Sequence, residues 1–157
     1  MSERLEFLTT GEEETRALGR RLAESLRGGE RVGLAGELGA GKTCLVRGIA
    51  EGLHIRPELV RSPSFTLLVP YEGGRLPLYH VDLFRLAPGK ADTGELREVL
   101  YGSGVCAVEW FDRLAEPLED FLEIQLTFVG AERRRLVAVG HGVGYHHMMR
   151  GLRQVAD

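Results

Sequence analysis

Cysteine is scarce in this chain of 157 residues, which contains only Cys44 and Cys106. Each of the two lies within an apolar stretch of the sequence. A pair placed in this way excludes a disulfide framework and a zinc knuckle. We therefore expect two buried thiols in the reducing environment of the cytoplasm.

An excess of charge of one sign is also lacking. The chain has 23 acidic and 20 basic residues, and its formal net charge is −3. No global positive field is available to attract a nucleic acid. Unaided binding to RNA or DNA is therefore not expected.

Long apolar runs are absent as well. None approaches the roughly 20 residues that a membrane-spanning helix needs. Residues 1–4 lead into a polar segment rather than into a secretory leader. The sequence shows no internal repeat and no low-complexity linker. These absences favour a cytoplasmic protein without membrane association, and a single domain over residues 1–157.

What is present is an alternation of predicted strands and helices with one interruption. A hairpin turn at Glu72–Arg75 breaks the strand–helix alternation, so we expect an α/β fold with a mixed central sheet flanked by helices. Thr10 and Glu13 have the spacing of a capping box at the start of the first helix, which the glycines at 28 and 29 end. Further helices are expected over residues 42–53, 95–100 and 145–155. Strands are expected over residues 5–8, 31–35, 65–71, 76–84, 105–108, 122–128 and 135–139.

The segment between the second strand and the second helix satisfies the P-loop pattern GxxxxGK[ST] in full. Its residues are Gly36, Glu37, Leu38, Gly39, Ala40, Gly41, Lys42 and Thr43. Glycines let backbone N–H groups surround a phosphate at the positive end of the following helix. Lys42 is suited to the β- and γ-phosphates, and the Thr43 hydroxyl is suited to Mg²⁺. The alternative is a glycine-rich turn with a chance lysine.

Two acidic residues are candidates to complete this site. Glu109 directly follows the apolar run Val105–Val108, where a P-loop protein usually has an acid that orients the metal or its water. Asp82 lies in an otherwise apolar strand, on the same face as His80 because strand side chains alternate. Burying its carboxylate is costly without a cation or a donor, so Asp82 could serve the metal or the attacking water. The alternatives are a surface carboxylate for Glu109 and a half-exposed edge strand for Asp82.

Two basic segments carry weaker signals. His141, His146 and His147 have no cysteine or acidic companion nearby, so a polar terminal segment is favoured over a zinc site. The run Arg133-Arg134-Arg135 is typical of a solvated strand entrance. Its alternative is contact with a nucleotide base or phosphate.

The remaining motifs bear on which class of phosphate protein this is. Neither NKxD nor DxxG follows the glycine loop, so adenine rather than guanine is the expected base. A small-metabolite kinase stays open, although such enzymes usually carry an arginine-bearing lid where this chain has its hairpin. A nucleotide-dependent binding module with incidental hydrolysis is the other alternative.

Four segments occur in the order and approximate spacing of one family. They read GELGAGKT (Gly36–Thr43), SPSFTLLVPY (Ser62–Tyr71), LYHVDLFRL (Leu78–Leu86) and VEW (Val108–Trp110). Over about residues 5–152 the chain resembles the TsaE family, formerly called YjeE. Its members are small P-loop ATPases of bacterial tRNA threonylcarbamoyladenosine biosynthesis.

The resemblance implies roles for the residues of the catalytic site. Lys42 and Thr43 would be the Walker A lysine and the Mg²⁺ ligand. Glu109 would be the Walker B-type acid on the metal, and Asp82 a catalytic acid. Trp110 would contact the nucleotide and the partner surface.

The resemblance also implies where the rest of the nucleotide lies. Thr66, in a switch-like segment over 62–66, would sense the γ-phosphate. The base would lie against Thr10 and Glu12, and beside Arg133 and Arg135.

By the same resemblance, the protein would bind the TsaD–TsaB complex and reset it by hydrolysing ATP to ADP. It would reach tRNA only through that complex. Hydrolysis would be slow until the partner completes the site, as trans-acting groups do in other P-loop systems.

Overall fold

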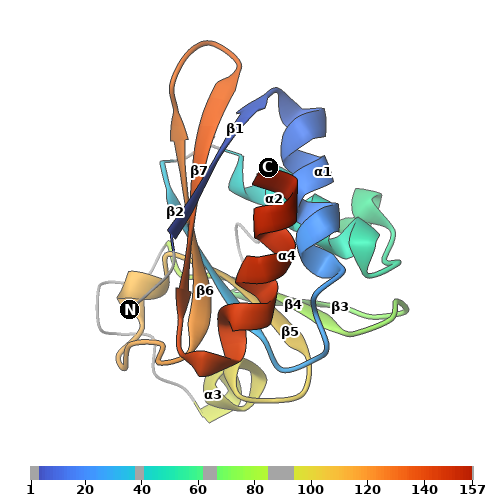
Figure 1. Ribbon diagram of the computed structural model, residues 1–157. Coiled ribbons are helices and arrows are strands. Elements are labelled where there is room, and N and C mark those ends of the chain that lie inside the picture. Colours follow the sequence, from blue (N-terminus) through green and yellow to red (C-terminus); the bar gives the residue numbers. More distant parts are fainter. Residues whose placement is uncertain (1–3, 38–40, 62–66, 85–93, 157) are drawn as a thin grey trace.

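The computed structural model describes residues 4–37, 41–61, 67–84 and 94–156 of the chain (Figure 1). Within them the strands are β1 (Arg4–Thr10), β2 (Arg31–Gly36), β3 (Leu68–Tyr71), β4 (Leu78–Asp82), β5 (Val105–Glu109), β6 (Phe121–Phe128) and β7 (Arg133–His141). The α-helices are α1 (Glu12–Ala23), α2 (Lys42–Gly52), α3 (Gly94–Leu100) and α4 (His146–Ala156). Short 3-10 helices are η1 (Pro57–Leu59), η2 (Phe111–Arg113) and η3 (Val143–Tyr145).

All seven of these strands belong to one sheet, in the order β1-β7-β6-β2-β5-β4-β3. The four central strands β6, β2, β5 and β4 run parallel to one another. The outer pairs β1–β7, β7–β6 and β3–β4 are antiparallel, the last being the predicted hairpin. The expected α/β fold with a mixed central sheet is therefore confirmed.

The apolar core lies on both faces of this sheet. Strand β5 is buried along its whole length, as its continuous apolar sequence predicts. Val105 and Ala107 belong to a core cluster that includes buried residues of α1, α2 and α4. Cys106 and Val108 point to the opposite face and pack with α3. Figure 1 shows α1, α2 and α4 together on one side of the sheet.

Helices α1 and α2 approach each other through glycines. A Cβ atom at Gly19 would lie 2.5 Å from the carbonyl oxygen of Leu45. One at Gly48 would lie 2.2 Å from the carbonyl oxygen of Arg16. Only glycine permits backbones this close, and the contact fixes the helix that follows the glycine loop.

The start of α1 differs from the prediction. The N-cap is Gly11, with a φ of 112°, and not Thr10. Thr10 closes β1, and its hydroxyl donates to the carboxylate of Glu14 rather than Glu13. Gly11 makes no side-chain cap, so the predicted capping box is wrong. The turn from strand to helix needs a positive φ, which glycine adopts without strain.

Both cysteines are buried free thiols, as predicted. Burial raises the pKa of the Cys106 thiol to about 12. No helix within the four described ranges is long and apolar enough to cross a membrane.

Candidate functional site

The site lies where parallel strands end. Because β2, β5 and β4 run in one direction, their carboxyl ends meet at the same edge of the sheet. Glu109 is in register with Leu34 on one side and with Asp82 on the other. This edge is where ligands bind in open α/β sheets.

Glycines at both ends of the loop between β2 and α2 have positive φ values. Gly36, at 146°, leaves no room for a side chain, since a Cβ would lie 2.4 Å from the carbonyl oxygen of Leu126. Gly41 is the N-cap of α2 in the left-handed conformation, at 107°. The first turn of α2 holds no acidic residue. The positive end of the helix dipole is therefore not neutralised by a side chain of its own first turn.

Lys42 is folded back over this loop. Its side chain is only 5% exposed, and its Nζ donates to the carbonyl oxygen of Gly36 at 2.8 Å. The same atom lies 3.9 Å from Oε1 of Glu109 and 4.7 Å from the centre of the Trp110 ring. The ammonium thus meets a carbonyl, a carboxylate and an aromatic face within one small volume.

Trp110 is held over the lysine by its backbone and its neighbours. Its φ of 59° is unusual for a bulky residue. Its ring packs on Phe84 at 5.2 Å between centroids, and the guanidinium of Arg113 lies 5.2 Å from the ring centre. A positive φ at such a residue is a feature of functional sites, where surrounding contacts maintain it.

Glu109 is almost fully buried and is bonded to a histidine. Its Oε2 lies 2.5 Å from Nε2 of His80, whose side chain is 0% exposed. The alternation predicted for β4 is observed, since His80 and Asp82 share a face. Glu109 is therefore not the surface carboxylate that was the structural alternative.

Asp82 stands beside Glu109 and is half-buried. Its Oδ1 accepts the backbone N–H of Phe84 at 2.9 Å. Burial raises the pKa of the Asp82 carboxyl, and the negative charge of Glu109 raises it further. The Phe84 N–H, His80 and Lys42 act in the opposite direction. The edge-strand alternative for Asp82 is excluded, because β3 is the edge and β4 lies inside it.

The arginine run begins β7, which pairs with the end of β1 at this edge. Arg134 is the member that faces the loop, since its Nε would lie 3.0 Å from a Cβ on Gly41. Nε and Nη1 of Arg134 are buried and have no hydrogen-bond partner within the described part of the chain. Arg133 is exposed, and Arg135 is bound to Glu6 at 2.6 Å.

The other predicted nucleotide contacts are placed as follows. Thr10 pairs with Arg133 at the end of β1. The carbonyl oxygen of Glu12 accepts the thiol of Cys44 on α2 at 3.1 Å, so the start of α1 lies against the helix of the glycine loop. Glu37 is exposed and Thr43 is partly buried in the first turn of α2. Leu38, Gly39, Ala40 and Thr66 lie outside the described residues.

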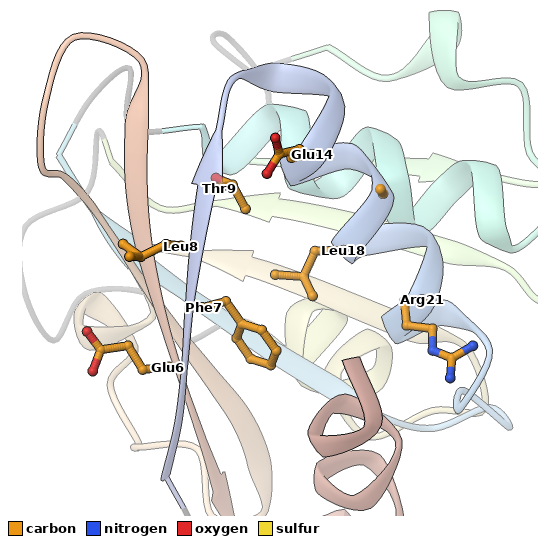
Figure 2. A pocket seen from close by; sticks show the side chains of 8 residues that line it. Glu6, Phe7, Leu8, Thr9, Glu14, Leu18 and Arg21 are labelled. Atoms are coloured by element: carbon orange, nitrogen blue, oxygen red, sulfur yellow. The ribbon is translucent and has the colours of Figure 1, made fainter. Parts of the chain in front are cut away.

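A groove of about 470 Å³ lies elsewhere, between β1 and α1 (Figure 2). Figure 2 shows Glu6 and Leu8 on one side of β1 and Phe7 on the other. None of the residues placed at the carboxyl edge as candidate catalytic groups lines this groove.

The donor atoms at the carboxyl edge fit Mg²⁺. They are hard oxygen ligands, namely the Thr43 hydroxyl and the carboxylate of Glu109, with that of Asp82 adjacent. Over the residues that the structure describes, no group of three or more His, Cys, Asp or Glu side chains could hold a metal. Mg²⁺ suits such a site, because it binds through one or two protein ligands together with waters and substrate phosphates.

These features define a mixed α/β protein with a glycine-rich, lysine-bearing loop between β2 and α2, and with one buried and one half-buried acid at the adjacent strand ends. The family model of the threonylcarbamoyl adenosine biosynthesis protein TsaE matches residues 9–136. The chain belongs to the TsaE family, as the sequence motifs indicated.

Relatives and a solved structure agree with this assignment. TsaE of Bacillus subtilis is 39% identical over 142 residues, which cover 90% of this chain and 89% of the relative. TsaE of Treponema pallidum is 49% identical over 98 residues, 61% of this chain and 70% of the relative. The crystal structure of Bacillus subtilis YdiB superposes with a TM-score of 0.83 at 32% identity, covering 100% of this chain and 99% of that one.

The sequence assigned no role to His80 and did not distinguish Arg134 within the predicted arginine run. His80 was seen only as a neighbour of Asp82, and its contact with Glu109, 29 positions away, needs the pairing of β4 with β5. The whole run Arg133–Arg135 was predicted as a possible nucleotide contact, with Arg133 and Arg135 placed beside the base. Successive side chains of a strand point to opposite faces, so Arg134 lies on the face opposite to Arg133 and Arg135. This alternation could have distinguished Arg134 from sequence alone.

Proposed function

We propose that this chain is a P-loop ATPase that supports N6-threonylcarbamoyladenosine modification of tRNA. It binds the TsaD–TsaB complex in the cytoplasm and resets it by Mg²⁺-dependent hydrolysis of ATP to ADP. It reaches tRNA only through that complex, which agrees with its slight negative net charge.

One observation carries this proposal. Lys42 has a buried ammonium that reaches both the loop carbonyl of Gly36 and the carboxylate of Glu109. An arriving polyphosphate offers this ammonium stronger, charge-assisted acceptors. Lys42 then leaves Gly36 for the phosphate oxygens, while the backbone N–H groups at the start of α2 bind the same phosphates.

The acidic residues have two different roles, metal binding and orientation of the attacking water. Thr43 and Glu109 would hold Mg²⁺, and the bound ion would neutralise charge that develops on the phosphates. Asp82 accepts a hydrogen bond from the attacking water and orients it. Burial favours this role, because a carboxylate with a raised pKa is a better proton acceptor than an exposed one. Arg134, whose Nε and Nη1 have no hydrogen-bond partner within the ranges that the structure describes, donates to the nucleotide beside Gly41.

The test uses two variants that leave the core intact. We expect Lys42→Ala and Asp82→Ala to be folded but to lose ATP hydrolysis and, as the only copy in cells, to lose the modified nucleoside. Arg56→Ala is the matched basic control, since Arg56 is exposed and pairs with the nearby, exposed Glu58. Normal nucleoside levels with either site variant would contradict the proposal.

A second experiment separates hydrolysis from transfer to a small molecule. The protein is incubated with γ-labelled ATP and a metabolite pool. Label recovered as free phosphate supports the ATPase, and label on a metabolite supports a kinase. Copurification of TsaD and TsaB with the tagged protein, with and without ATP, tests the proposed partners.

A further inference from the structure

The contact between His80 and Glu109 is unusual for a core. Both side chains are buried, at 0% and 5% exposure, and Nε2 lies 2.5 Å from Oε2. The Nδ1 atom of His80 is buried without a hydrogen-bond partner among the described residues. An apolar residue would fill this place without leaving a polar atom unpaired, so packing alone does not explain a histidine here.

The register of the sheet explains how the two side chains meet. His80 is in register with Ala107, and Glu109 is one step further along the same face of β5. The residue directly opposite His80 is Ala107, whose side chain is only a methyl group. The contact therefore follows from the parallel pairing of β4 with β5.

The chemistry of the two groups gives the direction of the bond. A carboxylate only accepts, so toward a carboxylate at Glu109 the donor is Nε2 of His80. The other carboxylate oxygen, Oε1, is the one that lies 3.9 Å from Nζ of Lys42. Oε2 is thus hydrogen-bonded to His80 in the sheet, and Oε1 faces the glycine loop.

We propose that His80 is a positioning residue that holds Glu109 with one carboxylate oxygen turned toward the loop and its cation. This inference rests on the proposed function, since it assigns His80 to the metal-binding acid. Carboxylates that bind metals are generally oriented by such outer hydrogen bonds, and their loss costs about 10- to 100-fold in metal affinity or activity.

The experiment compares three substitutions in the full chain. His80→Met keeps the volume but removes the donor. His80→Asn stays polar but is too short to reach Glu109, and it serves if the methionine variant does not fold. His80→Gln retains an N–H donor near the position of Nε2. Each variant is checked for a cooperative thermal transition before use.

Two quantities are measured for each variant. The first is the affinity for a fluorescent ADP analogue in EDTA and in Mg²⁺. The second is the Mg²⁺ concentration at half-maximal ATP hydrolysis. We expect His80→Met and His80→Asn to raise this concentration at least about tenfold while leaving nucleotide affinity in EDTA unchanged. The glutamine variant should recover most of the parent value.

The outcomes separate the alternatives. An unchanged Mg²⁺ requirement in His80→Met or His80→Asn overturns the positioning role, even if the protein is less stable. Equal impairment of all three variants, glutamine included, also overturns it and indicates a structural histidine. If the parent hydrolyses ATP equally well in EDTA and in Mg²⁺, the proposed function itself fails, and this inference fails with it.

Discussion

The ring centre of Trp110 lies 4.7 Å from Nζ of Lys42. This is close enough for a cation–π contact. Trp110 is also the only tryptophan of the chain, so its fluorescence comes from a single position beside the glycine loop.

The first prediction uses this contact. When Lys42 turns from Trp110 and Gly36 to a bound polyphosphate, the environment of the indole changes. We expect the tryptophan emission to change saturably on titration with ATP and Mg²⁺. Lys42→Ala should alter the starting emission and abolish the saturable change. An identical titration in Lys42→Ala would show that the signal does not come from this contact.

The second prediction concerns two neighbouring arginines on β7. Arg134→Ala removes a guanidinium that lies beside Gly41 and whose Nε and Nη1 have no hydrogen-bond partner among the described residues. Hydrogen bonds of charged groups contribute about 1.5–3 kcal/mol, so the Kd for nucleotide should rise roughly ten- to a hundredfold.

Arg135→Ala is the matched control for that variant. It removes only an exposed pair with Glu6, and such pairs contribute about 1 kcal/mol or less. Its Kd should stay close to that of the parent in isothermal titration calorimetry. A larger loss of affinity in Arg135→Ala than in Arg134→Ala would reverse the assignment.

Much of the fold followed from local sequence patterns. The hairpin between β3 and β4 and the buried strand β5 were predicted from a glycine turn and an apolar run. The N-cap of α1 was predicted one residue early, because Thr10 and Glu13 matched the spacing while the positive φ of Gly11 could not be seen in sequence. The order of the strands was not predictable, since it depends on pairings between distant segments.

Only those residues of the candidate site that belong to a recognisable sequence pattern were predictable. The pattern identified Lys42, and the position after an apolar run identified Glu109. The contact of Glu109 with His80 depends on the register between β4 and β5, for which a single sequence gives no signal. The position of Arg134, in contrast, was predictable. Side chains alternate between the two faces of a strand, so Arg134 points away from the face of Arg133 and Arg135.

The third prediction concerns the contact between α1 and α2. A Cβ at Gly48 would lie 2.2 Å from the carbonyl oxygen of Arg16, a backbone atom that cannot move alone. Gly48→Ala should therefore destabilise the protein by about 1–3 kcal/mol or more. Thermal unfolding measures the loss.

Gly144→Ala is the control for this substitution. A Cβ there meets no atom within 4 Å, so we expect a change within about 0.5 kcal/mol. Equal melting temperatures for Gly48→Ala and the parent would mean that the two helices are not held as closely as the structure has them.

The fourth prediction follows from the carboxyl of Asp82. Burial raises its pKa above the ordinary value of an aspartate, and the adjacent Glu109 raises it further. The folded state then binds a proton more tightly than the unfolded state does. The ionised carboxylate costs stability at neutral pH, and this cost disappears as the pH falls through the raised pKa.

Asp82→Asn tests that cost, because the amide is isosteric and its oxygen still accepts the N–H of Phe84. We expect a higher melting temperature than the parent at neutral pH, and a smaller difference near pH 4. The same variant should hydrolyse no ATP, so stability is gained where activity is lost, as at other sites that keep an unfavourable group for function. A melting temperature below that of the parent at neutral pH would show that the ionised Asp82 stabilises the fold, contrary to the direction of its pKa shift.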